Sequence, residues 1–159
     1  MSSVTEPTQL QEGSAFPDFE LLDQNGETQT LESLRGEPSI LYFYPKDDTS
    51  GCTAQACGFR DSLPEFSGAR VVGVSPDSVK SHKKFVEKYS LNFTLLADTE
   101  TTLCNAVGVW VEKSMYGKKY MGVERTTFLV DRGGIVRKIW RKVKVDGHAA
   151  EVAEALKRL

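Results

Sequence analysis

The sequence is short of the residues that build several common kinds of protein. Its 159 residues include only three cysteines, an odd count that does not suit the disulfide framework of a secreted domain. The formal net charge is −2 and basic residues are spread among acids, which disfavours nucleic acid or an anionic membrane as a partner. No apolar run approaches the roughly 20 residues that a membrane span needs.

The N-terminal residues, MSSVTEPTQLQEGS, lack the basic and apolar regions of a signal peptide. The sequence therefore predicts a cytoplasmic protein, in which important thiols are more often catalytic or metal-binding than structural. Zinc is disfavoured, because His82 and His148 lie far in sequence from Cys52 and Cys57 and four convergent ligands are not evident. We expect neither a metal nor a cofactor.

The composition is that of one globular domain. A chain of 17.6 kDa with 40% apolar and 26% charged residues is long enough to bury a core. We expect a single domain over residues 1–159, with 1–14 as a mobile tail. Strand patterns alternate with helix patterns and end in a hairpin and a helix. That order predicts an α/β fold with a central mixed β-sheet and helices on both faces.

Hydrophobic periodicity and turn residues predict the individual elements. Extended segments or strands are expected at 16–22, 27–30, 39–44, 70–75, 92–96, 125–131 and 135–141. Helices are expected at 31–35, from Cys52 or Thr53 onward, and at 77–89, 99–107 and 148–159. Residues 110–122 are expected to form a long loop. The continuously apolar segment 39–44 suits a central strand that is covered on both faces.

The most informative stretch follows that central strand. The chain passes through Pro45 and a short polar loop and delivers Cys52 to the first turn of a helix, which also carries Cys57. Unpaired N–H groups and the positive end of the helix dipole favour thiolate over thiol there. The junction predicts cysteine redox chemistry in a thioredoxin-like fold, although the C-x2-C of a dithiol reductase is absent.

Neighbouring residues in the loop suit a nucleophilic thiol. Thr49 can place its hydroxyl beside the sulfur of Cys52, and Pro45 fixes the chain and shields the site. Asp47 and Asp48 would oppose a thiolate if they faced it. We therefore expect both carboxylates to point outward.

Two other reactive residue types lie on apolar helix faces. His82 is either a general base or ligand or, as we favour without a partner motif nearby, a half-buried histidine with satisfied hydrogen bonds. Cys104 lies beside Leu103 and Val107 and is favoured as a buried, inert thiol over a second redox group.

The pattern Pro45-x3-Thr49-x2-Cys52 resembles the active-site signature of the peroxiredoxins. The surrounding FYPKDDTSGCTAQACGFRD is similar to the PrxQ subgroup, also called bacterioferritin comigratory proteins. The segments NFTLLAD (92–98), AVGVW (106–110) and RTTFLVD (125–131) fall where that subgroup has similar segments, so the resemblance covers most of the chain. Ser50 departs from it, because the subgroup commonly has proline there, but no reacting group is lost.

The resemblance implies an atypical 2-Cys, thioredoxin-dependent peroxiredoxin that reduces hydrogen peroxide and organic hydroperoxides in redox homeostasis and oxidant defence. Cys52 would attack the peroxide and become a sulfenic acid. Arg125 would hold the thiolate and polarise the peroxide, Thr49 would hydrogen-bond to it, and Pro45 would limit water. Cys57 would form a disulfide with Cys52, which a thioredoxin-type dithiol partner would reduce. A monomer is expected.

Helix geometry adds a constraint on the two cysteines. Five residues of ideal helix rise about 7.5 Å and leave the Cα atoms roughly 8–9 Å apart. A disulfide needs Cα atoms closer than about 7 Å. We therefore expect the first one or two turns to unwind in each cycle. Gly51 before the helix and Gly58 within it would weaken the helix by roughly 1 kcal/mol each.

Two alternative functions use the same cysteines. A redox sensor or holdase-like interaction protein would stop after one oxidation, whereas an enzyme consumes many peroxides per chain. A disulfide reductase is disfavoured by the missing C-x2-C. The enzyme is favoured because no sequence feature suggests a dedicated output surface.

Overall fold

A computed structural model describes residues 10–159 except residue 67. Its main sheet has seven strands in the order β2-β1-β5-β4-β3-β8-β9, in which β3 and β5 run parallel to β4 and the other neighbours pair antiparallel. The predicted mixed sheet is confirmed. The strands are β1 Glu20–Asp23, β2 Thr28–Thr30, β3 Ser39–Phe43, β4 Arg70–Ser75, β5 Thr94–Ala97, β8 Thr126–Val130 and β9 Val136–Trp140.

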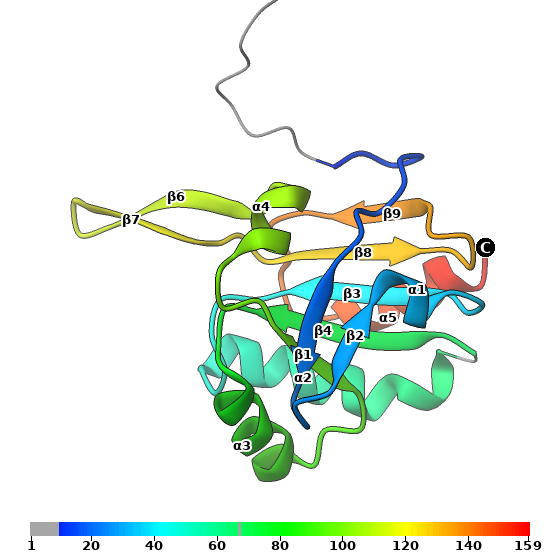
Figure 1. Cartoon of the computed structure of the whole chain (residues 1–159), viewed down its shortest axis with the longest axis horizontal. Helices are drawn as coiled ribbons and strands as arrows, with labels where there is room; N and C mark the ends of the chain where they lie inside the picture. The colour runs from blue at the N-terminus through cyan, green and yellow to red at the C-terminus, as the bar shows by residue number, and fades with distance from the viewer. Residues whose placement is uncertain (1–9, 67) are drawn as a thin grey trace, which may run out of the picture.

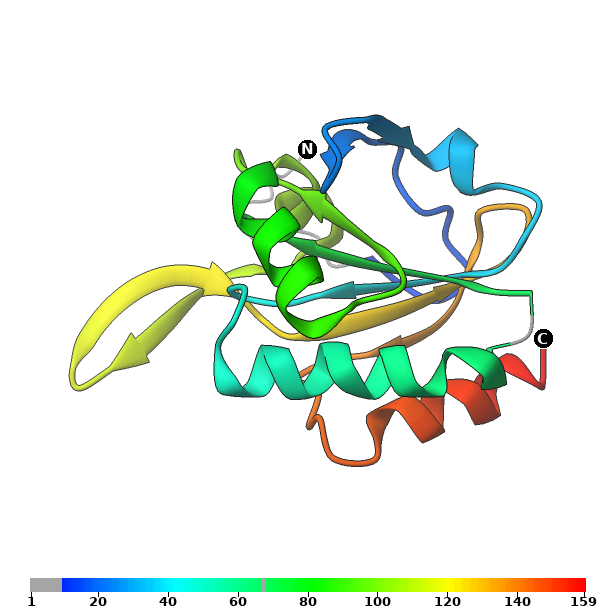
Figure 2. The ribbon, with the colours of Figure 1, turned by 90° about the horizontal axis from the view of Figure 1, so that it is seen from below.

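Helices cover both faces of this sheet, as predicted. They are α1 Leu31–Leu34, α2 Ser50–Ser62, the 3₁₀ turn η1 Leu63–Glu65, α3 Val79–Tyr89, α4 Thr102–Val107 and α5 His148–Leu156. Side chains alternate along a strand, so Leu41 and Phe43 pack with α1 and α4 on one face. Ile40, Tyr42 and Tyr44 pack with α2, α3 and α5 on the other face. On this second face α2 and α5 lie side by side (Figure 2).

The central strand β3 fixes where the cysteine helix begins. All five of its residues are buried, which explains the lack of hydrophobic alternation in this segment. Phe43 at its end pairs with Thr126 at the start of the antiparallel strand β8. This register brings the residue before β8, Arg125, to the edge of the sheet where the chain enters α2.

The structure corrects the expected long loop at 110–122. That stretch forms a β-hairpin of β6 Trp110–Met115 and β7 Lys118–Val123, which projects from the body of the molecule (Figure 1). Tyr116 and Gly117 form its turn with φ of 53° and 80°, values suited to a two-residue hairpin loop. Most of its residues are exposed, so neither face needs the apolar alternation by which a strand is recognised.

The predicted mobile tail is also partly corrected. Residues 1–9 of it lie outside the described residues. Residues 10–14 are bound to the domain: the Leu10 N–H donates to the Val107 carbonyl at 3.4 Å and the Gly13 N–H to the Val136 carbonyl at 2.8 Å. In the described part of the chain, no helix has the length and apolar character to span a membrane.

Candidate active site

The helix α2 begins earlier than its sequence pattern suggested. Thr49 is the N-cap residue with an extended backbone, and its carbonyl accepts a hydrogen bond from the Thr53 N–H at 2.8 Å. Cys52 is therefore the third residue of the helix, and Gly51 lies inside the helix instead of before it. The N–H groups of this first turn have no partner within the helix, which leaves a partial positive charge around the thiol.

Arg125 lies directly against the thiol of Cys52. Its Nη2 donates to Sγ at 3.3 Å and its Nη1 donates to Oε1 of Gln55 at 2.6 Å. Cys52 is 1% exposed and Gln55 is 3% exposed. A Cβ at Gly51 would lie only 3.1 Å from Nη2, so a larger residue at this position would press on the guanidinium and shift it by a few tenths of an ångström.

Gln55 was missed by the sequence analysis. Its spacing of three residues from Cys52 places both side chains on one face of α2, and this was the available signal. Only the pairing of β3 with β8 shows that Arg125 reaches the same face.

Lys113 on β6 is a second cation that the sequence did not reveal. Burial lowers its pKa and the positive charge of Arg125 lowers it further, while Cys52 and Glu124 raise it. The aliphatic part of the Lys113 side chain packs over Gly122, and a Cβ added at Gly122 would lie 3.2 Å from Cδ of Lys113. Lys113 thus lies within electrostatic range of both Cys52 and Arg125.

The structure places Thr49 and Pro45 at the two ends of the loop that leads to Cys52. The Thr49 hydroxyl donates to the Lys46 carbonyl at 3.0 Å, so in this state it closes the loop and is not committed to the sulfur. Pro45 is half-buried directly after the buried Tyr44. Rotation of χ1 would free the exposed Thr49 hydroxyl for another partner.

The expectation that Asp47 and Asp48 point outward is wrong for Asp47. Asp47 is 7% exposed and its carboxylate is turned toward α3. Asp48 is exposed, and its carboxylate accepts hydrogen bonds of 2.7 Å from both Lys88 and Tyr89, with the Lys88 contact lowering its pKa. Both carboxylates are therefore engaged by partners other than Cys52.

His82 is the histidine with satisfied hydrogen bonds that was favoured from the sequence. It is fully buried, however, and not half-buried. Nδ1 lies 2.7 Å from a carboxylate oxygen of Asp47 and Nε2 lies 2.9 Å from the Leu96 carbonyl.

All three thiols are free in this structure. Cys57 is half-buried on the unbroken helix α2, five residues after Cys52, so the intact helix holds the two sulfurs apart. Cys104 is fully buried in α4, and burial together with the Asp98 carboxylate raises its thiol pKa far above the usual range. A thiol in that environment is inert, which agrees with the interpretation favoured from the sequence.

Fold and site together define a class of protein, a thioredoxin-like domain that carries a thiol-dependent peroxidase centre. The chain belongs to the AhpC/TSA family, whose model matches residues 13–139, and within it to the peroxiredoxins of the PrxQ or Bcp type.

Several relatives are similar over nearly their whole length. A putative peroxiredoxin Bcp of Coxiella burnetii is 53% identical over 149 residues, covering 92% of this chain and 99% of that protein. Peroxiredoxin Bcp of Bacillus subtilis is 51% identical, covering 91% and 94%.

Solved structures of similar proteins have the same fold. A bacterioferritin comigratory protein of Xanthomonas campestris, described for its alkyl peroxide reduction activity, has a TM-score of 0.84 and 46% identity over 88% of this chain and 90% of that one. BcpB of Mycobacterium tuberculosis has a TM-score of 0.85 and 35% identity, covering 95% and 99%.

Proposed function

We propose that this thiol-dependent peroxidase uses Cys52 as its peroxidatic nucleophile and Cys57 as its resolving cysteine. The observation that carries the proposal is the 3.3 Å contact between Nη2 of Arg125 and the buried sulfur of Cys52 at the start of α2. A thiolate paired with a guanidinium is stabilised in the reactive form. The same guanidinium lies where charge develops on the oxygen that leaves.

The first step consumes the peroxide. The Cys52 thiolate attacks one oxygen of the O–O bond, so an S–O bond forms while the O–O bond breaks. The leaving oxygen takes the electron pair and a proton, and departs as water from hydrogen peroxide or as an alcohol from an organic hydroperoxide. Arg125 stabilises the developing negative charge, Thr49 offers a hydroxyl to the peroxide, and Pro45 limits the access of water. Cys52 becomes a sulfenic acid.

The second step regenerates a disulfide. The sulfur of Cys57 attacks the sulfenic sulfur of Cys52, an S–S bond forms, and hydroxide leaves as water after taking a proton. The intact helix α2 prevents this approach, since five residues of helix separate the two Cα atoms by roughly 8–9 Å. We infer that the first turns of α2 unwind before the disulfide forms. The half-buried position of Cys57 suits this motion, because the side chain has little packing to lose.

A dithiol partner of the thioredoxin type would return both cysteines to thiols. Thiol–disulfide exchange needs an accessible sulfur, and unwinding of α2 would expose one. The reducing cytoplasm suits such a cycle. Because one chain supplies Cys52, Cys57, Arg125, Thr49 and Pro45, we propose that a monomer with a single domain is the catalytic unit. The alkyl peroxide activity of the Xanthomonas relative supports organic hydroperoxides as substrates.

The proposal is tested by peroxide consumption with thioredoxin, thioredoxin reductase and NADPH. The wild-type chain is expected to turn over many peroxides and to show a Cys52–Cys57 disulfide by mass analysis. Cys52→Ser is expected to lose all activity, because in the described part of the chain no other thiol accepts a hydrogen bond from a guanidinium or ammonium group. Cys57→Ser is expected to form a sulfenic acid that dimedone traps, yet to stop after one turnover.

Cys104→Ser serves as the matched control, since its thiol is buried away from the site and should not affect turnover. Equal residual turnover in Cys52→Ser and Cys57→Ser would refute the assigned roles. A single turnover of the wild-type chain with thioredoxin present would favour a sensor over an enzyme.

A further inference from the structure

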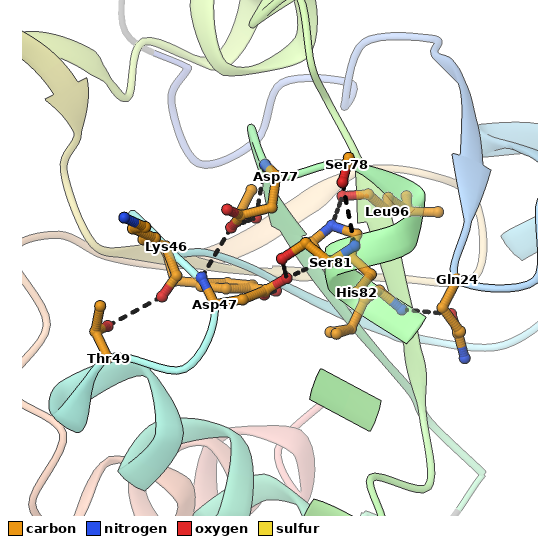
Figure 3. Close-up of polar contacts among 12 residues, drawn as sticks. Gln24, Lys46, Asp47, Thr49, Asp77, Ser78, Ser81, His82 and Leu96 are labelled. Atoms are coloured by element: carbon orange, nitrogen blue, oxygen red, sulfur yellow. Dashed lines mark hydrogen bonds and ion pairs between the residues drawn. The ribbon is translucent and has the colours of Figure 1, made fainter. Parts of the chain in front are cut away.

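The loop between β3 and α2 is tied to α3 by the buried carboxylate of Asp47. Oδ1 accepts a hydrogen bond of 2.6 Å from the Tyr44 hydroxyl. Oδ2 accepts one of 2.8 Å from the Ser81 hydroxyl and lies 2.7 Å from Nδ1 of His82. Figure 3 shows Asp47 beside these two residues of α3. One loop residue therefore holds both the strand end before it and the first turns of a helix.

His82 completes this contact by a hydrogen bond to the sheet. Its Nε2 lies 2.9 Å from the Leu96 carbonyl, which can only accept, so Nε2 carries a hydrogen. Nδ1 faces a carboxylate oxygen, which is also an acceptor, so a further proton lies between Nδ1 and Oδ2 of Asp47. The pair is bridged by a proton whichever partner carries it. Removing either side chain would leave a buried polar group without its partner.

A metal centre is the other use that these residue types suggest. Asp47, Asp77 and His82 each offer a ligand atom, and these atoms lie within 4.8 Å of one another. The atoms are already engaged, however: Oδ2 of Asp77 accepts hydrogen bonds from the Asp47 N–H at 2.8 Å and from the Ser75 hydroxyl at 2.6 Å. The geometry is therefore that of a hydrogen-bonded cluster. We call the contacts of Asp47 with Ser81 and His82, which tie the loop to α3, the clamp.

The clamp lies in the turn that starts the cysteine helix. The Thr49 hydroxyl bonds back to the Lys46 carbonyl at 3.0 Å, which encloses Asp47 in a tight turn. Thr49 is also the N-cap of α2, and Cys52 follows in the first helical turn. A shift of Asp47 would move Thr49 and the start of α2 relative to Arg125, which is held independently by β8.

We propose that Asp47 and His82 are positioning residues of the peroxidase. This inference rests on the proposed roles of Cys52 and Cys57. The buried pair fixes residues 45–49 on α3, so that the Thr49 hydroxyl and the Cys52 sulfur meet the guanidinium in a reactive arrangement. It also keeps this loop in place while α2 unwinds, so the boundary between the rigid and the unwinding part lies at the N-cap.

The test compares two reactions of Cys52 in the full chain carrying Asp47→Ala. Reaction with hydrogen peroxide, followed by stopped-flow fluorescence, needs the aligned site. Alkylation of Cys52 by iodoacetamide, followed by peptide mass analysis, needs only an accessible thiolate. Because a misplacement of about 1 Å can cost about 100-fold, the peroxide rate constant is expected to fall about 10- to 100-fold. The alkylation rate is expected to change far less.

Two further variants separate positioning from general destabilisation. In Asp47→Asn the amide can donate to Nδ1 of a neutral His82 and still accept from Tyr44, so most of the peroxide rate is expected to return. Asp98→Asn alters another buried carboxylate, which accepts the backbone N–H groups of Leu103 and Cys104 at 3.2 and 2.8 Å. Asp98 lies between β5 and α4, and in the described part of the chain its carboxylate bonds to α4 and not to residues 45–49, so the peroxide rate constant of the folded protein is expected to stay unchanged.

The positioning role is overturned if Asp47→Ala reacts with peroxide at the wild-type rate, or if its two reactions slow in equal proportion. It is equally overturned if Asp98→Asn slows the peroxide reaction as much as Asp47→Ala. Cys52→Ser is measured alongside: if it retained the fast reaction with peroxide, the proposed function itself would fail. The two failures are thus distinguishable.

Discussion

The guanidinium of Arg125 is oriented by two groups, the sulfur of Cys52 and the amide oxygen of Gln55. Gln55→Leu removes the second contact with little change in volume. We expect the peroxide rate constant of Cys52 to fall about 10-fold or more, because a guanidinium free to rotate presents Nη2 to the sulfur for only part of the time. Stopped-flow measurements at varied peroxide concentration would give this constant.

Stability should respond differently to the same substitution. Nε2 of Gln55 is buried and has no hydrogen-bond partner among the residues that the structure describes, so replacing this side chain by leucine relieves a cost as well as breaking one bond. The free energy of unfolding is expected to change by about 1 kcal/mol or less. Gln55→Glu keeps an acceptor for Nη1, but its negative charge would compete with the Cys52 thiolate for Arg125, so it is not expected to restore the full rate. A wild-type rate in Gln55→Leu would show that Arg125 needs no such support.

For single residues, the sequence identifies the reacting groups better than the side chains that hold those groups in place. Cys52 follows from its place after a strand, and Arg125 is named only by resemblance to a family. The sequence does not identify Gln55 and Lys113 as site residues, because their contacts depend on which strands pair. Asp47 was misjudged, since a carboxylate near a thiolate is unfavourable by charge alone, and its partners on α3 lie more than thirty residues away in sequence.

The helix α2 has two requirements that conflict. In the proposed cycle it must be intact to hold Cys52 under Arg125, and it must open to release Cys57. Thirteen residues form it without a break, and they include glycines at positions 51 and 58. A glycine weakens a helix because the unfolded backbone has more freedom to lose.

Gly58→Ala is expected to strengthen α2 without a steric penalty. An added Cβ would lie 4.0 Å from Cβ of Ala149, an ordinary van der Waals contact. The free energy of unfolding should rise by about 0.5–1 kcal/mol. If α2 opens before the disulfide forms, that step should slow by up to about 5-fold, since 1 kcal/mol corresponds to that factor. Peroxide reaction at Cys52 should keep its rate.

A matched variant with the opposite sign is Ala54→Gly, at an exposed position of the same helix. It should destabilise α2 by about 1 kcal/mol and speed disulfide formation. Rapid quenching with a thiol-blocking reagent and mass analysis would follow the disulfide in both variants. If disulfide formation is unaffected in both, the unwinding model is wrong.

For the whole molecule, alternation of strands and helices was enough to predict the mixed sheet with helices on both faces. Burial on both faces made 39–43 recognisable as the central strand. The second hairpin, β6–β7, was not predicted from the sequence, because it projects from the domain and few of its side chains are buried in the core. A hydrophobic pattern arises where side chains are buried, so a strand with few buried side chains cannot be predicted from that pattern.

His148 joins the layers behind the active site. Its ring packs edge-on against Phe59 of α2 and Trp140 of β9, with centroids 5.8 and 5.6 Å away, and Nε2 lies 2.9 Å from the Thr127 hydroxyl. Burial lowers the pKa of this histidine below its ordinary value, and the charge of Arg125 adds to that effect. Contact with Glu151 opposes it only in part. The folded protein therefore holds the ring neutral.

This predicts an acid-dependent loss of stability. In the unfolded chain the ring binds a proton near pH 6.5, whereas the folded protein resists it to lower pH. The stabilising contribution is fully present above about pH 6.5 and declines as the pH falls below it, by at most about 1.4 kcal/mol per pH unit. His148→Gln lacks this proton, so urea unfolding at pH 5–8 should show its stability deficit relative to wild type shrinking toward pH 5. A deficit that stays constant or grows on acidification would contradict a neutral, buried His148.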